Sequence, residues 1–286
     1  MIDFPDIRIP IGDVVEKFVQ YLAKNFDAFF DFIFIVASSA ISGLETGLLA
    51  IPWWIFLILV FLLGWYFTSI SGGVLFGVFI LLIGSFDLWS ETMTTIAIVL
   101  ISVILSLVIG IPLGILMAFN KTFSVIMRPL LDAMQTMPSF VYLIPVIFFF
   151  PLGNVPAVIA TIIYAVSPVM RLTELAIRNV DKEVVESAQS FGSSTMQMLT
   201  KVQLPQALPT IMAGVNQTTM MALAMAVVGS MVGAGGLGER VLFAINRLDI
   251  SLGFEAGLSI VFLAIIIDRV TGGIAERLQK QRGNGA

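Results

Sequence analysis

A mostly polar segment between long apolar runs, Asp181–Pro205, carries the clearest functional spacing in this chain. Glu186 is followed six residues later by Gly192, and Leu204-Pro205 close the segment. The chain has no histidine and no cysteine, which excludes imidazole catalysis, thiol chemistry, disulfides and metal sites built from these residues. The segment therefore predicts a docking surface rather than a catalytic centre.

The first half of the segment has the pattern of a short capped helix. Its apolar residues recur at helical spacing on one side: Val184, Val185, Ala188 and Phe191. Asp181 is a suitable N-cap, and Val180 and Val185 stand where a hydrophobic staple would pair them. The sequence predicts a helix that begins just after Asp181.

The second half predicts a sharp turn and another helix. Gly192 stands where a left-handed residue would end the first helix, and Ser193 or Ser194 can cap the next one. Leu204-Pro205 is expected to end that second helix and start the following element. The predicted shape is helix, turn, helix, held out from a membrane.

Composition places the rest of the chain in a membrane. Of the 286 residues, 58% are hydrophobic and 12% are charged, against about 25% charged residues in soluble domains. Several runs approach or exceed the ~20 apolar residues of a spanning helix, and the alternating segments of a β-barrel are absent. No basic patch with interleaved aromatics predicts nucleic-acid binding. The predicted fold is an all-α polytopic membrane protein.

Hydropathy predicts about seven spans after an N-terminal part that lies outside or at the interface. That part is residues 1–46: residues 11–24 form an amphipathic helix, and the run within 27–46 is too short to span. Residues 47–275 form the transmembrane domain with a cytoplasmic loop at 173–206, and 276–286 are a cytoplasmic tail. The expected spans are about 48–67, 72–86, 93–118, 129–150, 154–172, 207–232 and 254–273.

The distribution of lysine and arginine predicts the orientation. With seven crossings and the 181–205 segment in the cytoplasm, ten of the 15 basic residues fall on the inner side. The positive-inside rule then places the N-terminus outside and the C-terminus in the cytoplasm.

The 181–205 segment resembles the EAA loop of ABC importer permeases. The family pattern is Glu-Ala-Ala, three residues, Gly, nine residues, Ile, one residue, Leu-Pro, and its spacing is matched throughout. Ser187 replaces the first alanine and Val202 the isoleucine. The resemblance implies that these residues contact a separate ATPase: Glu186, Ser187, Ala188, Gly192, Val202, Leu204 and Pro205.

Nearly the whole chain resembles the permeases that import glycine betaine and proline betaine in bacteria. Gln135-Thr136-Met137-Pro138 and the Gly233–Gly238 run carry this part of the likeness. It implies the transmembrane domain of a type I ABC importer in the bacterial cell membrane. It also implies a homodimer of permeases, two ATPase subunits that hold ATP and magnesium, and a separate solute-binding protein. The chain itself is expected to bind no cofactor and to be no enzyme.

The expected translocation path combines a proline-broken helix with the interior of the sixth span. Methionine side chains adapt to varied ligands, and small residues leave room. The residues expected along the path are Gln135, Met137, Pro138, Asn216, Met220, Met221 and Met225. Ordinary packing between helices is the alternative interpretation of the same residues.

Other functions remain as alternatives. The related-family alternative keeps the same fold but has choline, carnitine or an amino acid as cargo. An ion-coupled carrier needs ionisable or broken-helix sites near the midplane, and the span centres hold no Asp, Glu, Lys or Arg. An intramembrane enzyme would need a histidine base or a pair of aspartates in the middle of the membrane, and this chain has neither. No phosphate-binding loop of the G-x-x-x-x-G-K-[ST] type is present, so energy must come from another subunit.

Gly233–Gly238 also fits the G-x-G-x-x-G pattern of dinucleotide-binding loops. That pattern requires a strand before the loop, whereas here the loop follows an apolar helix. We expect a flexible turn on the outer side.

Overall fold

The computed structural model describes residues 10–283, and within them the chain forms helices and turns without a strand. The helices are α1 (Ile11–Asn25), α2 (Asp27–Ala50), α3 (Trp53–Phe67), α4 (Ile70–Ser85), α5 (Trp89–Phe119), α6 (Lys121–Thr136), η1 (Ser139–Tyr142), α7 (Leu143–Phe149), α8 (Asn154–Arg178), α9 (Lys182–Ser190), α10 (Thr195–Gln197), η2 (Met198–Gln203), α11 (Leu204–Val228), η3 (Gly229–Val232), α12 (Leu237–Arg247) and α13 (Ile250–Gly283).

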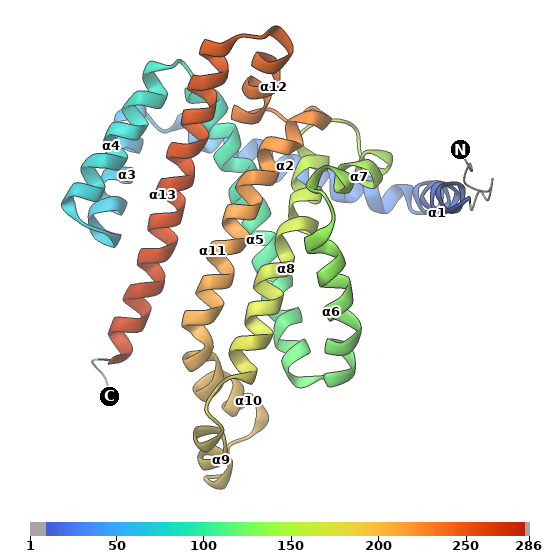
Figure 1. The fold of residues 1–286 in the computed structure, drawn as a ribbon, viewed down its shortest axis with the longest axis vertical. Coiled ribbons are helices and arrows are strands. Elements are labelled where there is room, and N and C mark those ends of the chain that lie inside the picture. The colour runs from blue at the N-terminus through green and yellow to red at the C-terminus, as the bar shows by residue number, and fades with distance from the viewer. Residues whose placement is uncertain (1–9, 284–286) are drawn as a thin grey trace, which may run out of the picture.

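Helices α5, α8 and α11 lie side by side at the centre of the bundle (Figure 1). α5 and α8 run parallel. Near their starts, Thr95 on α5 and Asn154 on α8 both accept hydrogen bonds from the turn at 235–237. Near their ends, Arg178 on α8 reaches the Met117 carbonyl on α5. Gly110 and Gly114 allow this crossing: a Cβ on Gly114 would lie 2.6 Å from the Met170 carbonyl oxygen. These two glycines therefore let α5 and α8 approach each other closely.

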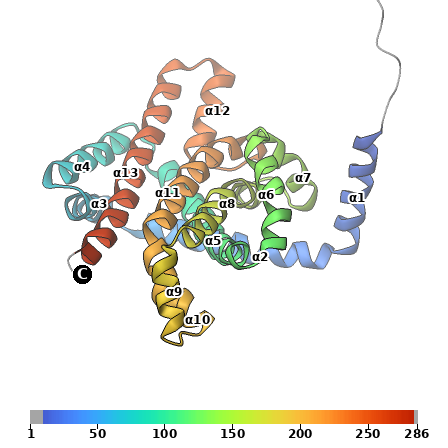
Figure 2. The same ribbon diagram turned by 60° about the horizontal axis from the view of Figure 1, so that its bottom comes forward.

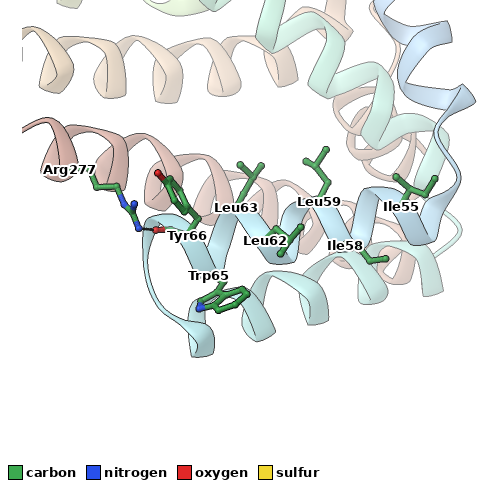
Figure 3. Close-up of a pocket in the computed structure, with 8 residues that line it drawn as sticks. All are labelled: Ile55, Ile58, Leu59, Leu62, Leu63, Trp65, Tyr66 and Arg277. Carbon is green, nitrogen blue, oxygen red and sulfur yellow. Dashed lines mark hydrogen bonds between the residues drawn. The ribbon is translucent and has the colours of Figure 1, made fainter.

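α3 and α4 form an antiparallel hairpin that packs against α13 (Figure 1). At 15 and 16 residues they are shorter than a standard span, since ~20 residues are needed to cross ~30 Å of hydrocarbon. An apolar groove runs along the outer face of α3 and ends at Tyr66 and Arg277 (Figure 3). The Arg277 guanidinium lies 3.7 Å from the centre of the Tyr66 ring and donates to the Tyr66 carbonyl.

The expected span at 129–150 is sharply bent. α6 and the η1–α7 pair meet at an angle of 114° across Met137-Pro138. The break at Pro138 is confirmed, because the residue before a proline is driven out of the helical region and Met137 is extended. Pro145 does not break α7, because it lies within the first turn of this helix, where a missing N–H removes no helical hydrogen bond.

The N-terminal part forms one short and one long helix. Residues 27–46 were expected to be too short to span, but α2 has 24 residues and is long and apolar enough. The estimate from sequence stopped at the acidic residue Glu45, whose carboxylate in the structure accepts a hydrogen bond from Thr94 on α5 (2.5 Å). α2 nevertheless runs across the long helices rather than along them, and α1 projects from the bundle (Figures 1 and 2).

Within residues 10–283, fewer helices than the seven expected spans are each long and apolar enough to cross a membrane. Among the described residues five helices qualify by length and composition: α2, α5, α8, the continuous helix Thr195–Val232, and α13. The bent α6–α7 pair would be a sixth. α13 continues to Gly283, so much of the expected tail at 276–286 is helical; residues 1–9 and 284–286 lie outside the described residues.

The two ends of the bundle carry different elements. The 181–205 segment projects from one end, together with the final turns of α13, and α12 caps the opposite end (Figure 1). We refer to the end with α12 as the outer end.

Replacing Gly114 by alanine is predicted to destabilise the bundle by about 1–3 kcal/mol, the usual cost of overpacking. The new Cβ would meet the Met170 backbone and the Thr173 side chain, and the backbone cannot rotate away. Gly84→Ala is the matched control, because a Cβ there has no atom within 4 Å. Thermal unfolding in detergent should show a lower midpoint for Gly114→Ala alone; equal midpoints would contradict the close crossing.

Candidate functional site

The 181–205 segment begins with the predicted capped helix. The Asp181 carboxylate accepts a hydrogen bond from the Glu183 amide (2.9 Å) at the start of α9, so the N-cap is confirmed. Val180 and Val185 join one apolar cluster, whose other members come from the ends of α5, α8 and α11 and from Leu199 in η2. This cluster fixes the angle at which α9 leaves the bundle.

The predicted turn is also confirmed. Gly192 has a φ of 78°, the left-handed region that glycine enters without strain. Ser194 then caps α10 reciprocally: its hydroxyl accepts from the Gln197 amide (3.3 Å), and the Gln197 side chain accepts from the Ser194 amide (2.9 Å). Short-range spacing alone determines this part of the site.

The expected break at Leu204-Pro205 is wrong. α10 passes through the π-helical turn η2 into α11 without interruption, and Leu204 has helical backbone angles. Proline lacks an N–H and its ring clashes with the carbonyl four residues earlier, but the wider π turn absorbs both defects. The result is one continuous helix from Thr195 to Val232.

The tip of the segment exposes large apolar side chains. Phe191 is 89% exposed and Met196 is 68% exposed. Glu186 and Ser187 are also exposed on α9, whereas Ala188, Val202, Leu204 and Pro205 are partly buried. Figure 2 shows α9 and α10 standing free of the remaining helices. Two faces result: one attaches the segment to its bundle, and the other is open to a partner.

The residues expected along the translocation path are scattered in the structure. Gln135, Met137 and Pro138 are exposed at the bend between α6 and η1, and Met220 and Met221 are partly buried on α11. Met225 is fully buried in the core of the chain, so it presents no surface to a path in this conformation. Asn216 instead joins α11 to α13, donating to Asp268 (3.0 Å) and accepting from Thr271 (2.5 Å).

An exposed face of α11 was missed by the sequence reasoning. Its residues are uncharged and small or polar: Gln206, Ala213, Gln217 and Ala224 are all exposed. They recur at intervals of four and seven residues, which places them on one side of the helix. That spacing is the signal that could have selected Gln217 in place of its neighbour Asn216. A polar amide on the surface of an apolar span needs water or a partner group.

The sequence profile described as "Binding-protein-dependent transport system inner membrane component" matches residues 110–281, more than half of the chain. The chain belongs to this family of transporter permeases. Its fold is accordingly that of an ABC importer transmembrane domain, and its homologues are permease subunits rather than enzymes.

Curated relatives extend the match over nearly the whole chain. It is 44% identical to the glycine betaine/proline betaine permease ProW of Escherichia coli, over 98% of this chain and 79% of that protein. The glycine betaine permease OpuAB of Bacillus subtilis is 43% identical, over 97% and 98%. The glycine betaine/carnitine permease GbuB of Listeria monocytogenes is 45% identical, over 92% and 94%.

A solved structure shares the fold at low identity. The inward-facing MetNI methionine ABC transporter matches with a TM-score of 0.58 and 23% identity, over 64% of this chain and 92% of that one. The predicted all-α type I importer fold is confirmed.

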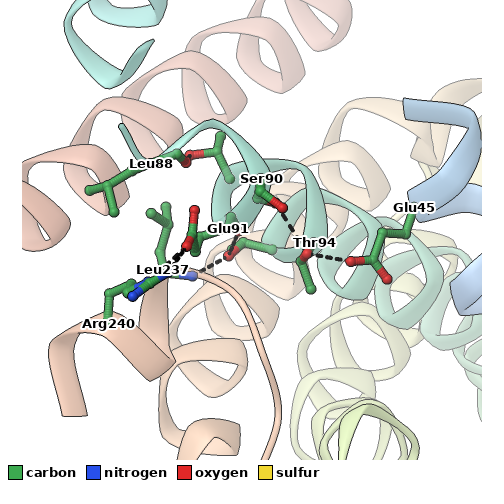
Figure 4. A network of polar contacts seen from close by, with 9 residues as sticks. Glu45, Leu88, Ser90, Glu91, Thr94, Leu237 and Arg240 are labelled. Atoms are coloured by element: carbon green, nitrogen blue, oxygen red, sulfur yellow. Dashed lines mark hydrogen bonds and ion pairs between the residues drawn. The ribbon is translucent and has the colours of Figure 1, made fainter. Parts of the chain in front are cut away.

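The glycine run at the outer end of the permease is firmly held, so the expected flexibility is wrong. The Leu237 amide donates to Thr95 on α5 (2.8 Å), and the Gly235 amide donates to Asn154 on α8 (2.9 Å). Gly236 has a φ of 94°, and a Cβ there would lie 2.5 Å from the Thr95 hydroxyl. An ion pair between Arg240 and Glu91 closes the same contact (Figure 4). Its glycines serve close packing, and the expectation that this run is no dinucleotide loop is supported by the helices on both sides.

Two substitutions at Gly192 should distinguish the effect of its left-handed backbone conformation from the effect of adding a side chain. Gly192→Val should destabilise the turn by about 1–2 kcal/mol, because the left-handed region is unfavourable for a branched residue. Amide hydrogen exchange in α9 and α10 should then quicken roughly 5- to 30-fold. Gly192→Asn is the control, since asparagine tolerates this conformation. Equal exchange in both variants would contradict the role of the left-handed turn.

Proposed function

We propose that this chain is the permease subunit of an ATP-driven importer of glycine betaine and related quaternary ammonium solutes. The observation that carries the proposal is the 181–205 segment, which projects from the bundle with an open apolar tip and continues directly into α11. The relatives that match over most of this chain are named as betaine permeases, which supports the cargo.

The 181–205 segment is the docking surface for the ATPase. A short amphipathic helix that offers apolar residues to a groove is a recurrent mode of recognition. Phe191 supplies the aromatic anchor, Glu186 orients the contact, and Gly192 sets the angle between α9 and α10. Ser187 and Ala188 lie beside Glu186, and Val202, Leu204 and Pro205 join the surface to α11. Two permeases and two ATPase subunits would form the complete transporter, with ATP and magnesium held by the ATPase.

The continuous helix Thr195–Val232 gives docking a mechanical consequence. A hinge at Leu204-Pro205 would allow the segment to move alone, whereas an unbroken helix transmits its movement to the outer end. Movement of the ATPase pair would therefore tilt α11 and open or close the path between two copies. The exposed face of α11 with Gln217 would line that path, together with Gln135, Met137 and Pro138 at the bend of α6.

The proposed cargo fits a path without fixed charge. A quaternary ammonium solute carries its own positive charge, and cation–π attraction to an aromatic cage would hold it in the separate binding protein. The exposed face of α11 offers amide and small apolar groups rather than ions. Carnitine is the second candidate, because the Listeria relative is named for both solutes.

We also propose that the 181–205 segment and the C-terminus lie in the cytoplasm, with the N-terminus outside. Lys121, Arg178, Lys182 and Lys201 lie at the end of the bundle that carries the segment, which supports this orientation by the positive-inside rule. The segment and the final turns of α13 share one end of the bundle.

Phe191→Ala should weaken ATPase binding by about 10-fold or more, as expected for an aromatic anchor. Its side chain is 89% exposed, so the thermal stability of the permease alone should not change. Ile250→Ala, at a residue 86% exposed at the opposite end, is the control. Co-purification and ATPase titration measure the effect. Wild-type affinity in a Phe191→Ala, Glu186→Ala double variant would refute docking at this surface.

The cargo can be tested with the reconstituted transporter. ATPase activity should rise when the binding protein is loaded with glycine betaine, because loaded binding protein favours the conformation that hydrolyses ATP. Carnitine, choline and methionine form the comparison arms. A response to methionine alone would overturn the proposed cargo and leave the ATPase docking intact.

A further inference from the structure

Glu174 is a charged residue sealed inside the end of the bundle near the 181–205 segment. It lies on α8 and only 2% of its surface is exposed. An isolated carboxylate is costly to bury, so such a group needs charged or hydrogen-bonding partners. Nothing in the proposed docking or in the proposed path uses it.

Two arginines and a serine from neighbouring turns satisfy the carboxylate. On α6, Arg128 donates to it at 2.9 Å and Ser124 at 2.6 Å. On α8 itself, Arg178 forms an ion pair with it at 3.1 Å. Arg178 also donates to the Met117 carbonyl at the end of α5 (2.7 Å). Glu174 therefore links three helices through a single buried charge.

This cluster has the 181–205 segment on one side and α6 on the other. Arg178 lines a cleft of about 300 Å³ together with Lys182, Glu186 and Gln189 of α9. On the other side, Ser124 and Arg128 belong to α6, which runs to the bend at Met137-Pro138. The cluster is thus interposed between the proposed docking surface and the bent helix.

We propose that Glu174 is a positioning residue that couples movement of the 181–205 segment to α6. This inference rests on the proposed function. When docking draws the end of α8 and Arg178 aside, Arg128 and Ser124 remain the partners of the buried carboxylate, and losing them as well would be costly. Ser124 and Arg128 then follow Glu174, and α6 moves with the segment.

A second ion pair between the same two helices provides a matched control. Arg171 on α8 pairs with Asp132 on α6 at 2.5 Å, but their side chains are 39% and 62% exposed. Exposed pairs of this kind are weak, because water solvates either charge when the pair opens. The Arg171–Asp132 pair can therefore open without forcing α6 to follow α8.

The test compares Glu174→Gln with Asp132→Asn in liposomes that contain the ATPase and receive solute-loaded binding protein. Solute uptake per ATP hydrolysed should fall about 10-fold in Glu174→Gln, a typical coupling energy. The ratio should stay within about twofold of wild type in Asp132→Asn. Dividing uptake by hydrolysis removes any difference in the amount of folded protein, which a merely structural role would change.

Arg128→Gln keeps the test decisive if Glu174→Gln fails to fold. Its side chain is 56% exposed, and Glu174 retains Arg178 and Ser124. The expected result is the same loss of the ratio. A wild-type ratio in either folded variant would overturn the coupling role and leave the proposed function standing. Absence of ATP-driven uptake in the wild-type complex would instead refute the proposed function.

Discussion

The parallel crossing of α5 and α8 is the contact on which the rest of the structure depends. Lipid is as apolar as the helix surfaces, so close packing and buried polar contacts must hold membrane helices together. Gly110 and Gly114 bring the two backbones close enough for both. At the outer end Thr95 and Asn154 hold the glycine turn together, and at the other end Arg178 reaches the Met117 carbonyl.

The polar contacts are concentrated at the two ends of this crossing. The outer cluster includes Glu91 and Arg240, and the inner one includes Glu174 and Arg128. Between them the core of α5, α8 and α11 is mainly apolar, with a few buried hydroxyls such as that of Thr218, which donates to the Ala165 carbonyl on α8. A bundle built this way is rigid where its ends are tied, and the 181–205 segment is attached to it through a small apolar cluster. Movement of the segment would thus reach the bundle as a whole.

Local sequence patterns predicted the parts of the structure that depend on near neighbours. The N-cap at Asp181, the turn at Gly192 and the cap at Ser194 each rest on contacts within three or four residues. The errors arose where distant residues decide the outcome. Asn216 is engaged by Asp268 and Thr271, more than 50 positions away, and Glu45 is tolerated in α2 because Thr94 binds it. The docking role of the segment stays a prediction.

The length of the unbroken helix from Thr195 to Val232 also amplifies a small tilt into a large displacement at its far end. Its 38 residues give a rod of about 57 Å at 1.5 Å per residue. Tilting such a rod by about 5° about one end displaces the other end by about 5 Å, close to one helical turn. The π turn at Met198–Gln203 keeps that rod continuous past Pro205. A small rotation at the ATPase would therefore be enough to change which residues face each other at the far side of the membrane.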